Sequence, residues 1–136
     1  MLYTKLNSEK ALIWRIVHRD NLGWILDNGL YCGNSTMKAP AWVNIGNPEL
    51  IDKRAHHPVP LPPGGWLNDY VPFYFTPFST MLRNIHTGWG GMQKRANEEI
   101  VILVSSLRHI ARMGLPFLFT DAHAYYQWAN FYADVA

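Results

Sequence analysis

One stretch constrains the fold more than any other: ALIWRIVHRDNLGWILDNGLYCGN, residues 11–34. Its apolar run from Leu12 to Val17 is rich in β-branched residues, and it is too short and too unbroken for a lone amphipathic helix. It therefore predicts a buried strand with a single cation, Arg15, inside it. The strand and the helix after it can line one wall of a cleft for an anionic or dinucleotide ligand, or they can contribute core alone.

The helix after this strand has recognisable ends. Asp20 is a favourable N-cap residue, and Gly29 tolerates the left-handed conformation in which many helices end. The apolar face between them comprises Leu22, Ile25 and Leu26. This part of the chain therefore predicts a strand, a turn and a short helix.

Length and composition indicate a single globular domain, residues 1–136. The chain is 49% hydrophobic and 16% charged, and a domain of this size buries roughly two thirds of its unfolded surface. It has no apolar run near the ~20 residues that cross a bilayer, and its N-terminus lacks the apolar region of a signal peptide. The one cysteine, Cys32, allows no internal disulfide. We therefore expect a cytoplasmic protein that does not enter a membrane.

Basic residues are concentrated in the middle of the chain. Residues 53–112 carry seven basic side chains against three acidic ones. Such a distribution can neutralise the phosphates of one nucleic-acid strand, and it is equally typical of an ordinary solvated surface. Exposed aromatic side chains could stack on unpaired bases, although most of them are more simply assigned to the core.

Residues 34–48 are rich in turn formers and predict a long ordered loop. Its apolar anchors are Trp42, Val43 and Ile45. Long loops inside a compact domain are uncommon and are often functional, so this one is a candidate ligand lid.

A helical turn is expected over residues 49–57, and four prolines in residues 56–65 predict an extended, stiff connector. His56 and His57 point to opposite sides of an extended chain, and no cysteine or carboxylate stands at ligand spacing from them. No metal site is predicted.

The second half of the chain alternates apolar runs with turn signals, which favours a mixed core of helices and strands. The predicted elements are a buried strand at 69–77 that contains Tyr74, a helix at 81–85 capped by Ser79, a mobile exposed loop at 88–97, a central strand at 99–105, a helix from Ser106 to Gly114, a strand at 116–120, and a helix capped by Asp121 with Tyr125, Trp128, Ala129 and Tyr132 on one face.

Several blocks of this sequence resemble one family in order. They are WRIVHRDNLGWILDNGL, VNIGNPELIDKRAHHPVP, PPGGWLNDYVPFYFTPFSTML, EEIVILVS and PFLFTDAHAYY. They resemble DarT, a bacterial DNA ADP-ribosyltransferase toxin that is paired with a macrodomain antitoxin, DarG. The resemblance implies an α+β, ADP-ribosyltransferase-like fold with a split mixed β-sheet, incomplete at the C-terminus. It also implies transfer of ADP-ribose from NAD to thymidine in single-stranded DNA.

The resemblance also suggests site residues. It places NAD contacts on the strand Arg15, Ile16 and Val17, and it extends the NAD-binding lid from about Met37 to Arg54. Arg54 matches the catalytic arginine, and His123 matches a histidine that opens the target-recognition loop. The remaining cofactor-binding positions are Trp24, Cys32 and Tyr74.

The chemistry of the reaction suits these residue types. A guanidinium can hold a phosphate bidentately or polarise a base oxygen, and its very high pKa leaves proton removal to a partner such as His123. Without the resemblance, Arg54 would be interpreted as a solvated cation beside Lys53, and His123 as a residue in the first turn of a helix.

The family's catalytic glutamate has no counterpart among Glu9, Glu49, Glu98 and Glu99. We therefore expect an inactive or weakened chain, truncated or interrupted, that exposes an unpaired sheet edge and self-associates or is only marginally stable. An alternative is a non-catalytic NAD- or single-stranded DNA-binding fragment of a split toxin. A weaker one is a relative that acts on RNA, such as a tRNA 2'-phosphotransferase.

Overall fold

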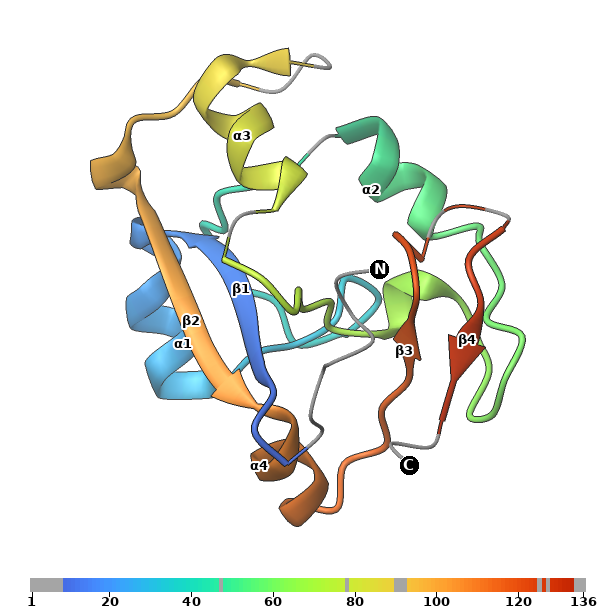
Figure 1. Cartoon of the computed structure of the whole chain (residues 1–136). Coiled ribbons are helices and arrows are strands. Elements are labelled where there is room, and N and C mark those ends of the chain that lie inside the picture. Colours follow the sequence, from blue (N-terminus) through green and yellow to red (C-terminus); the bar gives the residue numbers. More distant parts are fainter. Residues whose placement is uncertain are drawn as a thin grey trace.

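A computed structural model describes residues 9–46, 48–77, 79–89, 93–124, 126 and 128–133. It has the predicted α+β character and two small sheets (Figure 1). The helices and strands are β1 (Leu12–His18), α1 (Leu22–Asn28), α2 (Pro48–Arg54), α3 (Thr80–Thr87), β2 (Ile100–Ser106), α4 (Leu107–Arg112), β3 (Phe119–Thr120) and β4 (Phe131–Tyr132), with 3-10 turns at Arg19–Asn21, Leu67–Asp69 and Asn97–Glu99.

The first sheet is built on β1, which confirms the predicted opening strand. β1 and β2 pair antiparallel from Leu12 opposite Ser106 to His18 opposite Ile100. On its other edge, Trp14 exchanges two backbone hydrogen bonds of 2.8 Å with Tyr74. Among the described residues β2 pairs only with β1, so the prediction of a central strand at 99–105 is wrong: the inner position belongs to β1.

The predicted strand at 69–77 is reduced to this single bridge at Tyr74. Residues 67–69 form a 3-10 turn instead, in which the Asp69 carboxylate accepts the N–H of Trp66 at 2.8 Å. That side-chain bond competes with a sheet ladder at the start of the segment, as Asp side chains commonly do.

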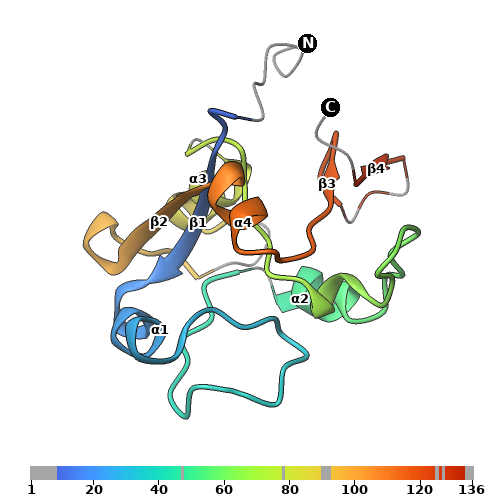
Figure 2. The ribbon, with the colours of Figure 1, turned by 90° about the horizontal axis from the view of Figure 1, so that it is seen from below.

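The second sheet corrects the prediction for the last part of the chain. Asp121 does not cap a helix; its carboxylate accepts hydrogen bonds from the backbone N–H and the side-chain amide of Asn130 at 2.8 and 2.7 Å. These bonds close the loop between β3 and β4, which pair antiparallel. Figures 1 and 2 place the two sheets on opposite sides of the molecule, so the sheet is split as predicted. Tyr125 lies outside the described residues.

The core lies between the first sheet and α3. Ile85 of α3 is 0% exposed and packs on Ile16 of β1. Around this pair are Ile45, Met81, Leu82, Ile100 and Ile102. Helix α3 has the predicted ends, because Ser79 accepts the N–H of Leu82 at 3.2 Å and Gly88 adopts a φ of 75°.

Two other predictions need correction. Helix α1 ends at Gly29, as predicted, but Asp20 lies in the preceding 3-10 turn rather than at an N-cap, and Leu26 is 76% exposed. Residues 56–65 are not a stiff connector: the N–H of Leu67 reaches back to the carbonyl of His57 at 2.9 Å. The turn that allows this contains Gly64 and Gly65 with φ of 76° and 80°, values that only glycine adopts easily.

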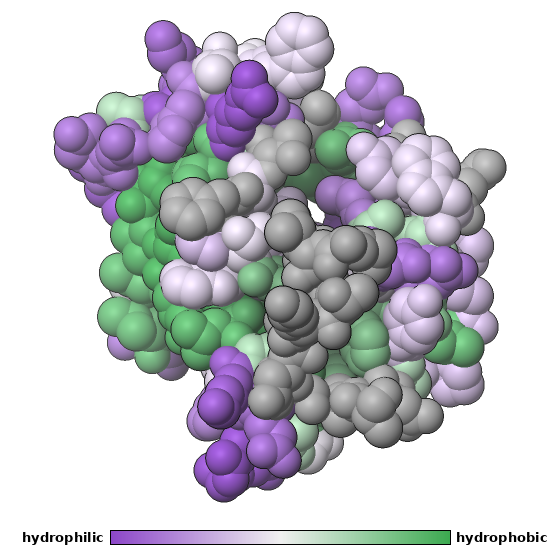
Figure 3. Space-filling model, in the orientation of Figure 1, coloured by the Kyte–Doolittle hydropathy of each residue, from purple (hydrophilic) through white to green (hydrophobic). Residues whose placement is uncertain are grey.

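The remaining expectations concern the surface. Figure 3 shows apolar side chains gathered over the side of the molecule that carries β2, where Val104 is 51% exposed. Self-association through an unpaired sheet edge remains a prediction. Residues 1–8 and the centre of the predicted loop at 88–97 lie outside the described residues. In the part of the chain that the structure describes, no helix is long and apolar enough to cross a membrane.

Candidate functional site

The structure brings together four of the predicted site residues from four separate segments. Arg15 lies in β1, Arg54 is the last residue of α2, Tyr74 lies at the bridge to β1, and His123 follows β3. Their charges interact: Arg54 lowers the pKa of both Arg15 and His123, and the two arginines act against the burial that raises the pKa of Tyr74. The four groups are therefore near enough for their charges to influence one another.

Arg15 is a largely buried cation that lacks a full set of partners. Its Nη1 donates to the carbonyl of Pro72 at 3.0 Å, whereas its Nε is buried without a hydrogen-bond partner. Burial, followed by the charge of Arg54, lowers the pKa of Arg15 to about 10. No ion pair with a carboxylate forms at Arg15 or Arg54 within the described part of the chain. Such a guanidinium is suited to receive an anion.

Helix α2 delivers Arg54 to this site. Pro48 suits the first helical position, while Glu49 in the first turn and Lys53 in the last turn complement the helix dipole. The Nη2 of Arg54 donates to the buried carbonyl of Leu67 at 2.9 Å, and burial lowers the pKa of Arg54. Its neighbour Lys53 pairs instead with Glu49 at 3.1 Å. Of these two adjacent cations, Lys53 therefore forms an ion pair on the surface of the helix, whereas Arg54 belongs to the candidate site.

Tyr74 contributes a neutral hydroxyl. Burial is the largest influence on the pKa of Tyr74 and raises it above the ordinary value, although Arg54 and Arg15 oppose the shift. The hydroxyl donates to the sulfur of Met81 at 3.5 Å. A hydrogen bond to sulfur is weak, so a polar ligand could replace it at little cost.

His123 is an exposed residue at the edge of the site. Desolvation and then the positive charge of Arg54 lower the pKa of His123 below its ordinary value. The imidazole is therefore neutral at pH 7 and able to accept a proton.

This electrostatic contact gives a direct test of the site's geometry. In the Arg54→Ala chain, the pKa of His123 should rise toward its ordinary value, because a nearby positive charge is removed. Titration of the histidine ring protons by NMR would measure the shift. The Arg83→Ala chain is the control, since it removes an exposed cation of α3. An unchanged His123 pKa in the Arg54→Ala chain would contradict this arrangement.

Three other residues predicted to contact NAD are Ile16 and Val17 in β1 and Trp24 in α1. Ile16 and Val17 are 6% and 2% exposed, so their side chains belong to the core. The backbone N–H and C=O groups of successive strand residues point to opposite edges of the strand. Those of Ile16 therefore point to the same edge of β1 as those of Trp14, toward the split between the two sheets. Trp24 lies on α1 and packs edge-on against Tyr31 and Trp42, at ring distances of 5.8 and 6.4 Å.

Cys32 is half-buried in the loop that follows α1. Its carbonyl accepts the N–H of Ser35 at 3.1 Å, which makes it part of a turn. Contact of Trp24 or Cys32 with NAD remains a prediction.

The predicted lid, from about Met37 to Arg54, comprises helix α2 and most of the loop between α1 and α2. Figure 2 shows this loop running along one side of the molecule. It is fastened near both ends. Asn34 bonds to Asn68 and to the carboxylate of Asp69, the latter at 2.7 Å. Near the other end of the loop, the side chain of Asn21 forms hydrogen bonds with the backbone of Val43. The sequence did not predict this role for Asn21, because Asp20 had the features of the capping residue.

A shallow groove lies beside this site. Its volume is about 630 Å³, and its lining comes from the end of α2 and from the loop before β4. It is lined by Asp52, Lys53, His56, His57, Pro58, Pro60, Tyr126, Ala129 and Phe131. At its side, Tyr126 and Trp128 stack at 4.3 Å, and Trp128 is 70% exposed. Exposed rings beside cations are suited to bind unpaired bases.

The described residues contain no group of three side chains that could hold a metal ion.

Comparison with known proteins adds independent evidence. Residues 14–136 match the family model of the ssDNA thymidine ADP-ribosyltransferase, DarT. The chain is 68% identical over 130 residues to a DNA ADP-ribosyl transferase of Escherichia coli O127:H6, which covers 96% of this chain and 60% of that relative. It is 40% identical over 127 residues to one from Thermus sp. strain 2.9, covering 93% of this chain and 60% of the relative.

Solved structures agree with this result. Thermus sp. 2.9 DarT in complex with ADP-ribosylated ssDNA matches at a TM-score of 0.84 and 40% identity, over 93% of this chain and 59% of that one. The same protein in complex with NAD+ matches at a TM-score of 0.77 and 39% identity, over 95% and 60% of the two chains. The α+β fold is therefore confirmed, and the chain spans about 60% of the length of the relatives that it matches.

Proposed function

The chain belongs to the DarT family, and we propose that the site formed by Arg15, Arg54 and Tyr74 binds NAD. The observation that carries this proposal is the pair of arginines that interact with each other but form no ion pair with a carboxylate among the described residues. Two like charges are brought together only at a cost, and a pyrophosphate would compensate it. The NAD+ complex of the Thermus relative supports the choice of this anion.

We further propose that the whole protein transfers ADP-ribose to thymidine in single-stranded DNA. When bound, NAD supplies the ADP-ribosyl group: the bond from ribose to nicotinamide breaks, a bond from ribose to the base forms, and nicotinamide and one proton are released. Arg15 and Arg54 would hold the pyrophosphate, which fixes the ribose in place. Neutral His123 would accept the proton from the base, since the guanidinium of Arg54 is already protonated.

DNA would enter through the groove beside α2. The stacked pair of Tyr126 and Trp128 offers a surface for an unpaired base. The Thermus complex with ADP-ribosylated ssDNA supports this substrate class. A macrodomain antitoxin of the DarG type and a toxin role are proposed on the family resemblance.

The 136-residue stretch is proposed to bind NAD without completing the transfer. The chemistry calls for a carboxylate to stabilise the positive charge that develops on the ribose. Two of the glutamates are engaged elsewhere: Glu49 pairs with Lys53, and Glu99 contacts Arg95 and His18. The alternative of a non-catalytic NAD-binding fragment therefore describes this stretch, whereas transfer belongs to the whole protein.

Calorimetry and a labelled-transfer assay would test these two statements separately. Titration of the 136-residue chain with NAD should give saturable binding, and incubation with labelled NAD and a thymidine-containing single-stranded oligonucleotide should leave the DNA unlabelled. An oligonucleotide in which uracil replaces thymine and a 2'-phosphorylated RNA serve as substrate controls. Absence of NAD binding would contradict the proposed site. Labelled DNA would contradict only the missing-carboxylate argument.

A further inference from the structure

We propose that Asn21 is a positioning residue for Arg54. Its side chain would hold the loop between α1 and α2 in place at Val43. The position of Val43 would then determine the position of α2, which carries Arg54. The ligand measurements below rest on the proposed NAD site, whereas the geometric measurement does not.

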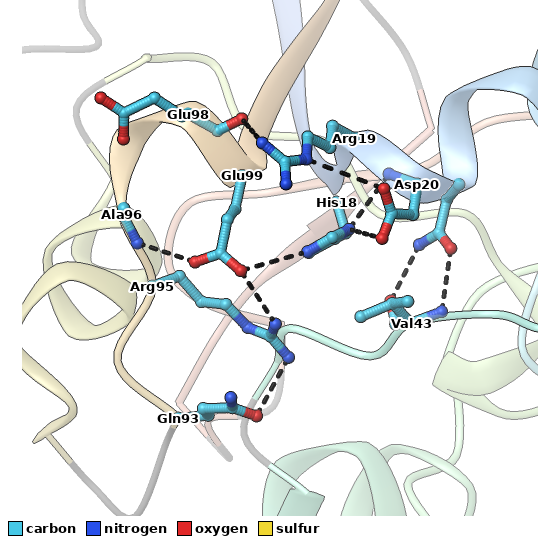
Figure 4. A network of polar contacts seen from close by, with 10 residues as sticks. His18, Arg19, Asp20, Val43, Gln93, Arg95, Ala96, Glu98 and Glu99 are labelled. Carbon is cyan, nitrogen blue, oxygen red and sulfur yellow. Dashed lines mark hydrogen bonds and ion pairs between the residues drawn. The ribbon is translucent and has the colours of Figure 1, made fainter.

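The clamp is a pair of hydrogen bonds between one side chain and one peptide unit. The Asn21 side-chain amide donates to the carbonyl of Val43 at 2.8 Å, and its oxygen accepts the N–H of Val43 at 2.8 Å. Both bonds are drawn at Val43 in Figure 4. Asn21 is 2% exposed, so its end of both bonds is shielded from water. A buried amide that satisfies both of its functions on one residue specifies that residue's position closely.

Asn21 lies next to the paired strands β1 and β2, in a turn that a hydrogen bond connects to β1. Asn21 closes the 3-10 turn after β1, and in that turn the N–H of Asp20 donates to Nδ1 of buried His18 at 3.1 Å. The other ring nitrogen of His18 lies 3.6 Å from the Glu99 carboxylate, just before β2 (Figure 4). Asn21 is thus attached to the end of the paired strands β1 and β2 and not to a loop.

Two contacts of described residues connect the loop after Val43 to the core and to α2. Ile45 packs against the core pair of Ile16 and Ile85. At Gly46, an added Cβ would lie 3.3 Å from Cδ1 of Ile51, so the loop there touches α2 directly. Helix α2 begins at Pro48 and ends at Arg54. If Val43 moved, α2 would therefore move with it, and so would the guanidinium of Arg54 at the end of this helix.

The test compares the Asn21→Ala chain with the Asn28→Ala chain. The control removes the same amide group from the exposed end of α1, where it bonds to the carbonyl of Trp24 at 3.0 Å and not to the loop. The geometric readout is the pKa of His123, which depends on the nearness of Arg54. It should rise in the Asn21→Ala chain and stay unchanged in the control.

The ligand readout is the affinity for NAD, measured by calorimetry at a temperature where each variant is folded. We expect affinity to fall about tenfold or more in the Asn21→Ala chain, because a misplaced guanidinium loses charge-assisted hydrogen bonds. The Asn28→Ala chain should bind like the wild type. A folded Asn21→Ala chain with wild-type NAD affinity and wild-type His123 pKa would overturn the proposal.

Amide exchange of the wild-type chain tests the clamp without any variant. The Val43 N–H should exchange much more slowly than an unprotected loop amide, since it is bonded to a buried side chain. Free-peptide exchange at Val43 would overturn the proposal even if the Asn21→Ala chain fails to fold. If the wild type binds no NAD, the proposed function fails, and the His123 pKa still decides the role of Asn21.

Discussion

Replacement of Arg54 by alanine is expected to weaken NAD binding by about 10- to 100-fold, because hydrogen bonds to charged groups contribute about 1.5–3 kcal/mol each. Arg54 is held by its bond to the Leu67 carbonyl and has no ion pair with a carboxylate in the described residues, so its charge is available to a pyrophosphate. Calorimetric titration of the Arg54→Ala chain with NAD measures the effect.

Two control variants make this result specific. Lys53→Ala removes the adjacent cation, which is 45% exposed and paired with Glu49, and it should change NAD affinity little. Arg54→Lys keeps the charge but loses the planar fork, and it should bind with intermediate affinity. Equal losses in the Lys53→Ala and Arg54→Ala chains would indicate a general effect of charge and would contradict a specific role for Arg54.

Replacement of Arg15 by methionine is expected to have two opposite effects. NAD binding should fall by about 10- to 100-fold for the same reason as at Arg54. The free energy of unfolding at pH 7 should be unchanged or higher, although one hydrogen bond to Pro72 is lost. Methionine fills a similar volume, and it removes a buried charge that lacks a carboxylate partner among the described residues.

The pKa shift of Arg15 has the sign that this prediction requires. The pKa of Arg15 in the folded chain is about 10, below the ordinary value of an arginine, so between these two pKa values the unfolded chain binds more protons than the folded one. Stability from this group therefore rises with pH in that window, and the full cost of the charge is present at pH 7. An anion bound beside Arg15 would relieve that cost.

Urea unfolding at pH 7 and NAD titration measure the two effects in the Arg15→Met chain. Arg19→Met is the control, because the exposed guanidinium of Arg19 bonds to the carbonyl of Glu98 at 3.2 Å away from the site. It should alter stability and binding only slightly. A stability loss of more than about 2 kcal/mol in the Arg15→Met chain with NAD binding intact would show that Arg15 is structural.

The sequence by itself determined the features that depend on neighbouring residues. The strand β1 follows from an apolar β-branched run, α3 from the cap at Ser79, and the end of α1 from Gly29, since each signal lies within a few residues of the element that it specifies. The family, and Arg15 and Arg54 as candidates, also came from the sequence, because the quoted blocks are rare enough to resemble only one family closely.

Tertiary structure decided the features that join distant residues. The helix predicted after Asp121 is a hairpin, because that carboxylate bonds to Asn130 instead of capping a helix. The site itself depends on the fold, since Arg15 and Arg54 are far apart in the chain and their charges interact only in the folded molecule. Asn21 had no local signal of its role: its partner, Val43, lies 22 residues away. A buried amide must find its hydrogen bonds wherever the packed chain provides them, and only the folded molecule shows where that is.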